Sequence, residues 1–240
     1  MKESLERPLT ALTGAGISAE SGVPTFRGQA GLWRDYSPHE LATPDAFNRN
    51  PELVWAWYAW RRETIAGCGP NPAHRTLVDM EESLKNFTLI TQNVDGLHQA
   101  AGSKRVIELH GSIWRLVCTG CRYVGDDKRV PLPDLPPRCQ ICGGVLRPDV
   151  IWFGESLRRE VLDAAWRVAA QSKVMLVIGT SAVVEPAASL PLVAQRAGAR
   201  LIEFNPDTTP MSRHADQVFR EPAGKALPRW WAETRGCWAL

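Results

Sequence analysis

The sequence predicts an α/β fold: a doubly wound, mostly parallel, Rossmann-like sheet with a small inserted zinc-binding module. Short apolar segments alternate with helical stretches along most of the chain, which is typical of parallel α/β sheets. One stretch, 117–146, breaks this alternation and carries two cysteine pairs. The 240 residues, 44% of them hydrophobic, suffice for one large domain with an insert. We therefore expect residues 1–116 and 147–240 to form the sheet domain, and 117–146 to form the module.

Six segments are predicted as buried strands, because they are short, apolar or β-branched, and bounded by Gly, Asn or Asp. The first stops at a glycine turn. The six segments are 9–12, 87–91, 106–109, 174–178, 201–204 and 217–219.

Four segments are predicted as helices. Asn50-Pro51 and Asn71-Pro72 each combine a capping side chain with a proline suited to the first helical position. They open helices that run to about Ala66 and Ser83. Two further helices are expected at about 157–171 and 187–197.

The stretch Val117–Leu146 shows no helical periodicity and is rich in proline. It carries two Cys-x2-Cys pairs, which in an intracellular chain indicate a metal site rather than disulfides. Four thiolates saturate tetrahedral zinc and leave no position for water, so we expect one structural zinc. Cys68 and Cys237 lie outside the pattern and are expected to be ordinary thiols. The predicted ligands are Cys118, Cys121, Cys139 and Cys142.

Composition and charge exclude several classes of function. The formal net charge is +2, from 28 basic and 26 acidic residues, so no nucleic-acid partner is expected. No apolar run approaches the length of about 18 residues that a membrane span needs. Met1–Pro8 has no apolar core of a signal peptide, which favours a cytoplasmic enzyme. The sequence leaves the oligomeric state open, and a monomer is favoured.

The first chemical motif is Gly14-Ala15-Gly16-Ile-Ser18, directly after the first strand. Glycines there let backbone amides approach a pyrophosphate, although an ordinary strand-to-helix turn fits the same pattern. The motif departs from the dehydrogenase fingerprint, because no strand ends in an acidic residue about 20 positions later. Asp35 and Glu40 lie in a proline-containing context instead.

Further motifs follow in a fixed order: 23–28 (Val-Pro-Thr-Phe-Arg-Gly), 91–98 (Thr-Gln-Asn-Val-Asp-Gly-Leu-His), His110-Gly111, 153–155 (Phe-Gly-Glu), 179–181 (Gly-Thr-Ser) and Asn205. With the cysteine quartet between them, the chain resembles the sirtuin family from Gly14 to about Pro228. The resemblance implies an NAD-dependent protein lysine deacylase that uses NAD and one structural zinc. Its partners would be proteins that carry acylated lysines.

The resemblance also implies a cofactor site at the carboxyl ends of the strands. Ala15, Ile17 and Phe26 would lie near the nicotinamide. Asn93 and Asp95 suit its carboxamide, which both donates and accepts hydrogen bonds. The implied cofactor-binding residues are Gly14, Ala15, Gly16, Ser18, Phe26, Arg27, Arg34, Gln92, Asn93, Val94, Asp95, Gly179, Thr180, Ser181, Asn205, Pro206, Asp207 and Ala223.

His110 resembles the general base of the family. In the implied reaction the acyl-lysine carbonyl oxygen attacks the ribose as nicotinamide leaves, and a ribose hydroxyl must then lose a proton. Histidine suits proton transfer near neutral pH. The implied products are nicotinamide, free lysine and O-acyl-ADP-ribose. The chain has five histidines, and only His110 stands at a strand end before Gly in this context.

The extended stretch Val150–Glu155 implies recognition of the substrate by added β-strand pairing, opposite residues 183–185. Ile151 would offer its carbonyl to the lysine nitrogen, with Phe153, Gly154 and Glu155 beside it. For Trp152, an ordinary place in a core strand remains an alternative.

Tyr58 and Arg61, at spacing i and i+3, share one face of the helix that Asn50 caps. A phenol and a guanidinium in one pocket bind a carboxylate, and the desuccinylase-like branch of sirtuins carries such a pair. Ala42 would make room for a longer acyl chain, so residues of about 30–70 would form a helical part of the acyl pocket. The alternative is an amphipathic helix on which Arg61 only extends its charge to solvent.

The acyl preference expected is for succinyl and malonyl over acetyl. An NAD-dependent deacetylase without that preference and a protein ADP-ribosyltransferase are the alternatives within the same chemistry. A binding module that needs NAD or zinc but catalyses nothing is the alternative from another class.

Overall fold

The computed structural model describes residues 8–26 and 37–238, and its largest element is a six-stranded parallel sheet. The strand order is β3-β2-β1-β7-β8-β9, the doubly wound order of dinucleotide-binding folds, with the direction of winding reversed between β1 and β7. This confirms the predicted fold class. The strands are β1 (Leu9–Thr13), β2 (Phe87–Thr91), β3 (Val106–Glu108), β7 (Val174–Ile178), β8 (Arg200–Phe204) and β9 (Gln217–Phe219).

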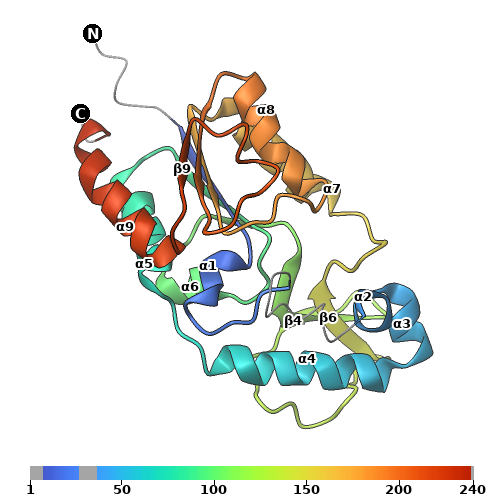
Figure 1. Cartoon of the computed structure of the whole chain (residues 1–240). Helices are drawn as coiled ribbons and strands as arrows, with labels where there is room; N and C mark the ends of the chain where they lie inside the picture. Colours follow the sequence, from blue (N-terminus) through green and yellow to red (C-terminus); the bar gives the residue numbers. More distant parts are fainter. Residues whose placement is uncertain (1–7, 27–36, 239–240) are drawn as a thin grey trace.

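Helices cover both faces of this sheet (Figure 1). On β1, Leu9 and Ala11 pack into the core that α5 (Pro72–Ser83) and α9 (Ala223–Thr234) complete. The neighbouring Leu12 belongs to the core on the other face, beneath α7 (Arg159–Gln171) and α8 (Leu190–Arg196). Because side chains alternate along a strand, apolar residues at every position bury both faces of the sheet.

The helix predictions hold with small shifts of their ends. The side chains of Asn50 and Asn71 accept backbone N–H bonds at the starts of α4 (Pro51–Ala66) and α5, as their sequence predicts. The predicted helix at 187–197 is wrong in one respect: it begins as a 3-10 turn, η2 (Ala187–Ser189), and becomes α-helical only as α8. Three further short elements are α1 (Gly16–Ala19), α6 (Leu97–Ala101) and η3 (Arg235–Cys237).

A second, antiparallel sheet of order β5-β4-β6 is built from β4 (Gly111–Cys118), β5 (Val124–Asp126) and β6 (Leu146–Val150). The predicted module, 117–146, lies within the span of this sheet, which begins and ends beyond it. The division of the chain into domains stays a prediction.

The second sheet packs on a separate core formed with α2 (Pro38–Leu41), α3 (Pro44–Arg49) and α4, seen below the main sheet in Figure 1. Trp55 of α4 donates its indole N–H to the carbonyl of Leu146 at 2.8 Å. Arg62, also on α4, is buried and donates to the backbone carbonyls of Ile113 and Arg129. Helix α4 is therefore joined by hydrogen bonds to the sheet that carries the cysteines.

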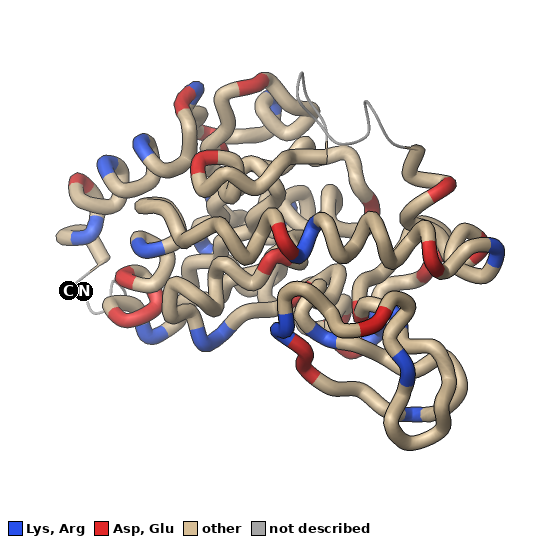
Figure 2. The backbone as a smooth tube through the Cα atoms, turned by 90° about the horizontal axis from the view of Figure 1, so that it is seen from below, with Lys and Arg blue, Asp and Glu red and all other residues tan. Residues whose placement is uncertain are grey.

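Acidic and basic residues are interspersed along the backbone drawn in Figure 2. None of the helices in the described part of the chain combines the length and hydropathy that crossing a lipid bilayer requires.

Candidate active site

A cavity of about 750 Å³ opens where the strands of the large sheet end. Its walls come from the loops after β1, β2, β7 and β8, from α4, and from the segment after β6. This is the place where doubly wound sheets bind ligands. Most of the residues selected from the sequence line it: Gly14, Ala15, Gly16, Phe26, Ala42, Tyr58, Arg61, Gln92, Asn93, Val94, His110, Ile151, Phe153, Gly154, Glu155, Gly179, Thr180, Ser181, Asn205, Pro206 and Asp207.

Four of the residues expected at the cofactor site do not line the cavity. Ile17, Ser18 and Asp95 are buried behind its wall, and Ala223 is buried next to Pro222, which does line it. Arg27 and Arg34 lie outside the described residues.

The glycines after β1 are required by close packing against the loop after β7. A Cβ on Gly16 would lie 2.7 Å from the Cα of Gly179. Gly179 itself has a φ of 58°, and a Cβ there would lie 2.4 Å from the amide nitrogen of Ile17. Only glycine allows this approach. The two loops therefore meet at the seam of the sheet and form one continuous wall of the cavity.

Polar side chains tie the strand ends together across that seam. Gln92, after β2, donates to the hydroxyl of Thr180, after β7, at 2.9 Å. Asn205, after β8, donates to the Thr180 carbonyl at 2.9 Å. Three strand ends are thus held in register where the cavity begins.

Asn93 is oriented by the buried residues behind it. Its amide donates to the Gly14 carbonyl at 3.1 Å and to the Ser18 hydroxyl at 3.2 Å. The Ser18 hydroxyl donates in turn to Asp95 at 2.8 Å. Burial raises the pKa of the Asp95 carboxyl, against the hydrogen bonds from Leu97 N–H and Ser18. With both amide hydrogens engaged, the side-chain oxygen of Asn93 is the atom left for a ligand.

His110 follows β3 and lines the cavity. Its Nδ1 lies 2.9 Å from the carbonyl oxygen of Gln92, which can only accept, so Nδ1 carries the hydrogen and Nε2 is left unprotonated. Burial lowers the pKa of the imidazole, although the bond to Gln92 opposes the shift. The ring is therefore neutral at neutral pH, with a free basic nitrogen. Next to it, Gly111 has a φ of 79° and no space for a Cβ against the Asp149 carbonyl.

Tyr58 and Arg61 are both buried and both line the cavity, as the i and i+3 spacing predicts. The Arg61 guanidinium carbon lies 4.9 Å from the ring centre of Phe26 and 5.0 Å from that of Trp57. Burial lowers the pKa of Arg61 and raises that of Tyr58. Arginine keeps its charge even so. The alternative, an Arg61 that extends into solvent, is wrong.

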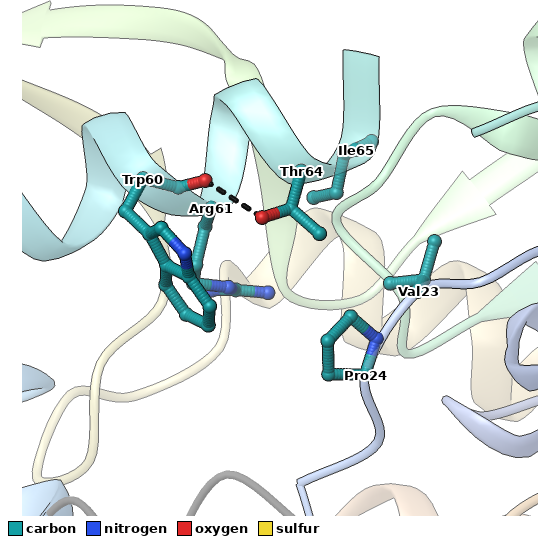
Figure 3. Close-up of a pocket in the computed structure, with 6 residues that line it drawn as sticks. All are labelled: Val23, Pro24, Trp60, Arg61, Thr64 and Ile65. Atoms are coloured by element: carbon teal, nitrogen blue, oxygen red, sulfur yellow. Dashed lines mark hydrogen bonds between the residues drawn. The ribbon is translucent and has the colours of Figure 1, made fainter. Parts of the chain in front are cut away.

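A separate hollow of about 10 Å³ adjoins the other side of Arg61 and is drawn in Figure 3. Val23 and Pro24 face the helix there, and Thr64 donates its hydroxyl to the Trp60 carbonyl at 3.0 Å. The hollow has room for about one water molecule at most, so it is a packing gap and no ligand site.

The segment after β6 forms another wall of the cavity. The Ile151 N–H donates to the His110 carbonyl at 3.0 Å, and the Phe153 N–H donates to the Ala42 carbonyl at 2.9 Å. The Phe153 side chain lines the cavity and is 40% exposed, so it places apolar surface at the opening.

Several residues that line the cavity were missed from the sequence. Glu20 accepts a hydrogen bond from the Gly224 amide at 2.6 Å, at the start of α9. Thr209 donates its hydroxyl to the buried carboxylate of Glu203 at 2.5 Å, which orders the loop after β8. The sequence offered one signal for this contact: Glu203 is an acidic residue inside an otherwise apolar strand, and a buried carboxylate needs a hydrogen-bond donor nearby. The other missed lining residues are Ala19, Thr25, Trp57, Leu157, Thr208 and Pro222.

The four predicted metal ligands gather at one point of the second sheet, and their sulfur atoms all lie within 4.8 Å of one another. Cys118 and Cys142 are 3.4 Å apart at sulfur, and Cys121 and Cys139 are 3.7 Å apart. Zinc–sulfur bonds of about 2.3 Å in a tetrahedron place sulfurs about 3.8 Å apart. The quartet is therefore positioned to bind one structural zinc ion.

Known proteins share both this sequence and this geometry. Residues 14–186 match the sequence model of the Sir2 family. The "NAD-dependent protein deacylase" of Aquifex aeolicus (strain VF5) is 55% identical over 221 residues, 92% of this chain and 92% of that protein.

Two solved structures are similar over almost the whole chain. The crystal structure of a Sir2 homolog–NAD complex has a TM-score of 0.91 at 48% identity, covering 98% of this chain and 92% of that one. A Sir2 variant with a deacetylated p53 peptide and 3'-O-acetyl ADP ribose has a TM-score of 0.84 at 34% identity, covering 95% and 93%. This chain belongs to the Sir2 family of NAD-dependent protein deacylases.

Proposed function

We propose that this protein removes acyl groups from protein lysines in an NAD-dependent reaction, with a preference for the acidic succinyl and malonyl groups. One observation carries the proposal: a single cavity is lined by the glycine loop, by His110, and by the Tyr58–Arg61 pair. The first suits a dinucleotide, the second is a base, and the third suits a carboxylate.

NAD supplies a nicotinamide–ribose bond that can be broken, and the loops at the seam of the sheet would hold it. Backbone amides after β1 and β7 would face the pyrophosphate, since the glycines there leave it uncovered by side chains. Asn93, oriented from behind by Ser18 and Asp95, would present its oxygen to the nicotinamide carboxamide. Asn205 and its neighbours would contact the adenosine half. Arg27, Arg34 and Ala223 remain proposed cofactor residues on the resemblance alone.

His110 would act as the general base. Its Nδ1–H is fixed on the Gln92 carbonyl, so Nε2 is the nitrogen that can take a proton from a ribose hydroxyl. Its lowered pKa keeps Nε2 unprotonated at neutral pH.

The substrate chain would enter between the segment after β6 and the loop after β7. Main-chain pairing with Val150–Glu155 would bind many sequences, because it does not read side chains. Ile151 would offer its carbonyl to the lysine nitrogen. The Sir2 structure that holds a p53 peptide supports a protein substrate.

The acidic-acyl preference rests on the charge at the end of the cavity. Arg61 and Tyr58 are buried beside it, and Ala42 leaves space near them. A desolvated guanidinium with a hydroxyl neighbour binds a carboxylate far better than a methyl group.

We also propose that 117–146 acts as a zinc module within the sheet domain formed by 1–116 and 147–240, and that the enzyme works in the cytoplasm. The paired cysteines support a cytoplasmic location, because a reducing compartment keeps thiolates available to zinc.

The test is nicotinamide release from NAD with matched acetyl-, malonyl- and succinyl-lysine peptides, together with mass spectrometry of the products. We expect free lysine, O-acyl-ADP-ribose and the highest kcat/KM with the acidic groups. ADP-ribosylated protein would indicate the transferase instead. No nicotinamide release with any peptide would leave only a binding module.

Two variants assign the roles. His110→Tyr is expected to abolish turnover of all three peptides while the fold persists. Arg61→Met is expected to lower kcat/KM for succinyl and malonyl peptides about 10- to 150-fold, the worth of a bond to a charged group, and to change acetyl turnover far less. Equal losses on all three peptides would reduce Arg61 to a structural residue.

A further inference from the structure

Trp152 makes the most specific contact with the proposed acyl pocket. It follows β6, is 3% exposed, and lines the cavity. Its indole N–H donates to the hydroxyl oxygen of Tyr58 at 2.8 Å, in a fully buried contact between residues far apart in the sequence.

This bond fixes the role of the Tyr58 hydroxyl. An indole nitrogen can only donate, so the phenol oxygen is the acceptor. The phenol proton must then point elsewhere, and the described residues record no acceptor for it. Tyr58 borders the cavity, so a bound ligand is the acceptor available to that proton. Burial raises the pKa of Tyr58, which keeps the proton on the oxygen.

The Trp152 ring is held in place on several sides. The Arg147 guanidinium carbon lies 3.4 Å from the ring centre, and the Phe47 ring centre is 5.2 Å away. Glu155 accepts the Trp152 backbone N–H at 2.8 Å while it pairs with Arg147 at 2.7 Å. A ring fixed in this way keeps its N–H aimed at Tyr58.

Arg61 lies beside the same hydroxyl. Among the described residues its guanidinium has three aromatic neighbours, Phe26, Trp57 and Tyr58. The buried Asp95 carboxyl attracts it electrostatically, but no salt bridge joins the two side chains. A positive charge and a hydroxyl proton therefore meet at one end of the cavity, and both favour an anionic acceptor.

We propose that Trp152 is a specificity-determining residue, whose indole N–H occupies the Tyr58 oxygen and thereby directs the phenol proton toward the terminal carboxylate of an acidic acyl group. Trp152 acts through Tyr58 as a positioning residue. The inference rests on the proposed acidic-acyl activity and adds to it the residue that orients the hydroxyl.

The test compares succinyl and acetyl peptides in Trp152→Phe, which keeps an aromatic ring and removes the N–H. We expect the ratio of kcat/KM for succinyl over acetyl to fall about three- to tenfold, mainly through a higher KM for succinyl. Trp55→Phe is the matched control. This variant also removes one buried indole hydrogen bond, the one to the Leu146 carbonyl, but Trp55 does not line the cavity. Its ratio should equal that of the wild type.

A double-mutant cycle separates positioning from packing. Tyr58→Phe should lower the ratio about tenfold, and adding Trp152→Phe should lower it no further, since Trp152 acts only through the hydroxyl. Independent, multiplying losses would overturn the inference, as would a Trp152→Phe ratio equal to that of the wild type. A wild-type enzyme with no succinyl preference would instead refute the proposed function on which the inference rests.

A comparison of two neutral acyl peptides tests the direction of the phenol proton without any Trp152 variant, and it can be used if Trp152→Phe does not fold. Levulinoyl- and isocaproyl-lysine peptides have neutral acyl groups of the same length, which end in a ketone and in a branched alkyl group. The wild type should prefer the levulinoyl peptide, and Tyr58→Phe should lose the preference. Equal turnover of both peptides by the wild type would mean that the phenol proton does not point into the cavity.

Discussion

The two sheets of this protein are stabilised in different ways. In the parallel sheet, all five residues of β1 are buried, and helices cover both faces. In the antiparallel sheet, β5 has two exposed residues out of three, and Ile141 between the cysteines is 72% exposed. The parallel sheet carries its own hydrophobic core, whereas the outer part of the antiparallel sheet depends on four thiolates. The cavity draws residues from both, so its geometry depends on two kinds of stabilisation.

Zinc removal should separate the two regions with the largest effect. Structural zinc in small modules contributes about 10–16 kcal/mol of apparent binding energy. With a chelator, or in Cys118→Ser, we expect amide hydrogen exchange to accelerate within 111–150 while β1, β2 and β7 stay protected. Nicotinamide release should fall as this sheet loosens. Ile151 directly follows β6, and its N–H donates to the His110 carbonyl, so the sheet helps to hold His110 in place. Loss of protection in both sheets together would show a single cooperative unit.

Truncation of apolar side chains should affect the parallel sheet far more than the antiparallel sheet, the opposite of zinc removal. Leu176, at the centre of β7, is fully buried, and Leu176→Ala should cost roughly 4 kcal/mol of unfolding free energy. Ile141→Ala, its counterpart between the cysteines, should change that energy by less than about 0.5 kcal/mol. Urea unfolding of the zinc-loaded protein measures both. Similar costs for the two variants would contradict the comparison.

Acid should weaken the parallel sheet through two buried histidines. The rings of His74 and His98 lie 4.9 Å apart beside β1. Burial lowers the pKa of His74 to about 4 and that of His98 to about 3. In the unfolded chain both titrate near pH 6.5, so the unfolded state binds protons first as the pH falls. The stability is therefore complete above about pH 6.5 and is lost between there and about pH 3.

For His74 alone this loss amounts to about 3 kcal/mol. Unfolding free energies of the wild type and His74→Gln, measured from pH 7 to pH 4, test it. The variant should lose less stability over this range. His39→Gln, on the exposed surface of α2, is the control, and an identical pH dependence of His74→Gln and the wild type would contradict the assignment.

The sequence predicted the parallel sheet well because its strands are apolar on both faces, as 174–178 illustrates. It did not predict the antiparallel sheet. In 111–118 the pairing slips between Ser112 and Leu116, which breaks the simple alternation of a strand. The zinc ligands could be predicted because each Cys-x2-Cys pair is a local pattern in the sequence. The strand pairing around them joins residues far apart in the sequence and could not.

Within the site, the sequence identified residues by type and order but could not assign their depth. Asp95 and Asn93 follow the same strand two positions apart, yet one lies behind the cavity wall and the other on it. Trp152 could equally have been an ordinary core residue, because nothing local in the sequence predicts that its N–H meets Tyr58. Such contacts depend on how helix and sheet pack in three dimensions.

The reversal of winding between β1 and β7 has a consequence for folding during synthesis. Residues from 14–26 and from 179–209 both line the cavity and meet at the seam of the sheet, so the two parts of this wall are synthesised early and late in translation. A nascent chain that has emerged only as far as the zinc ligands holds half a binding site. NAD can thus stabilise the finished fold but cannot guide the early steps of folding.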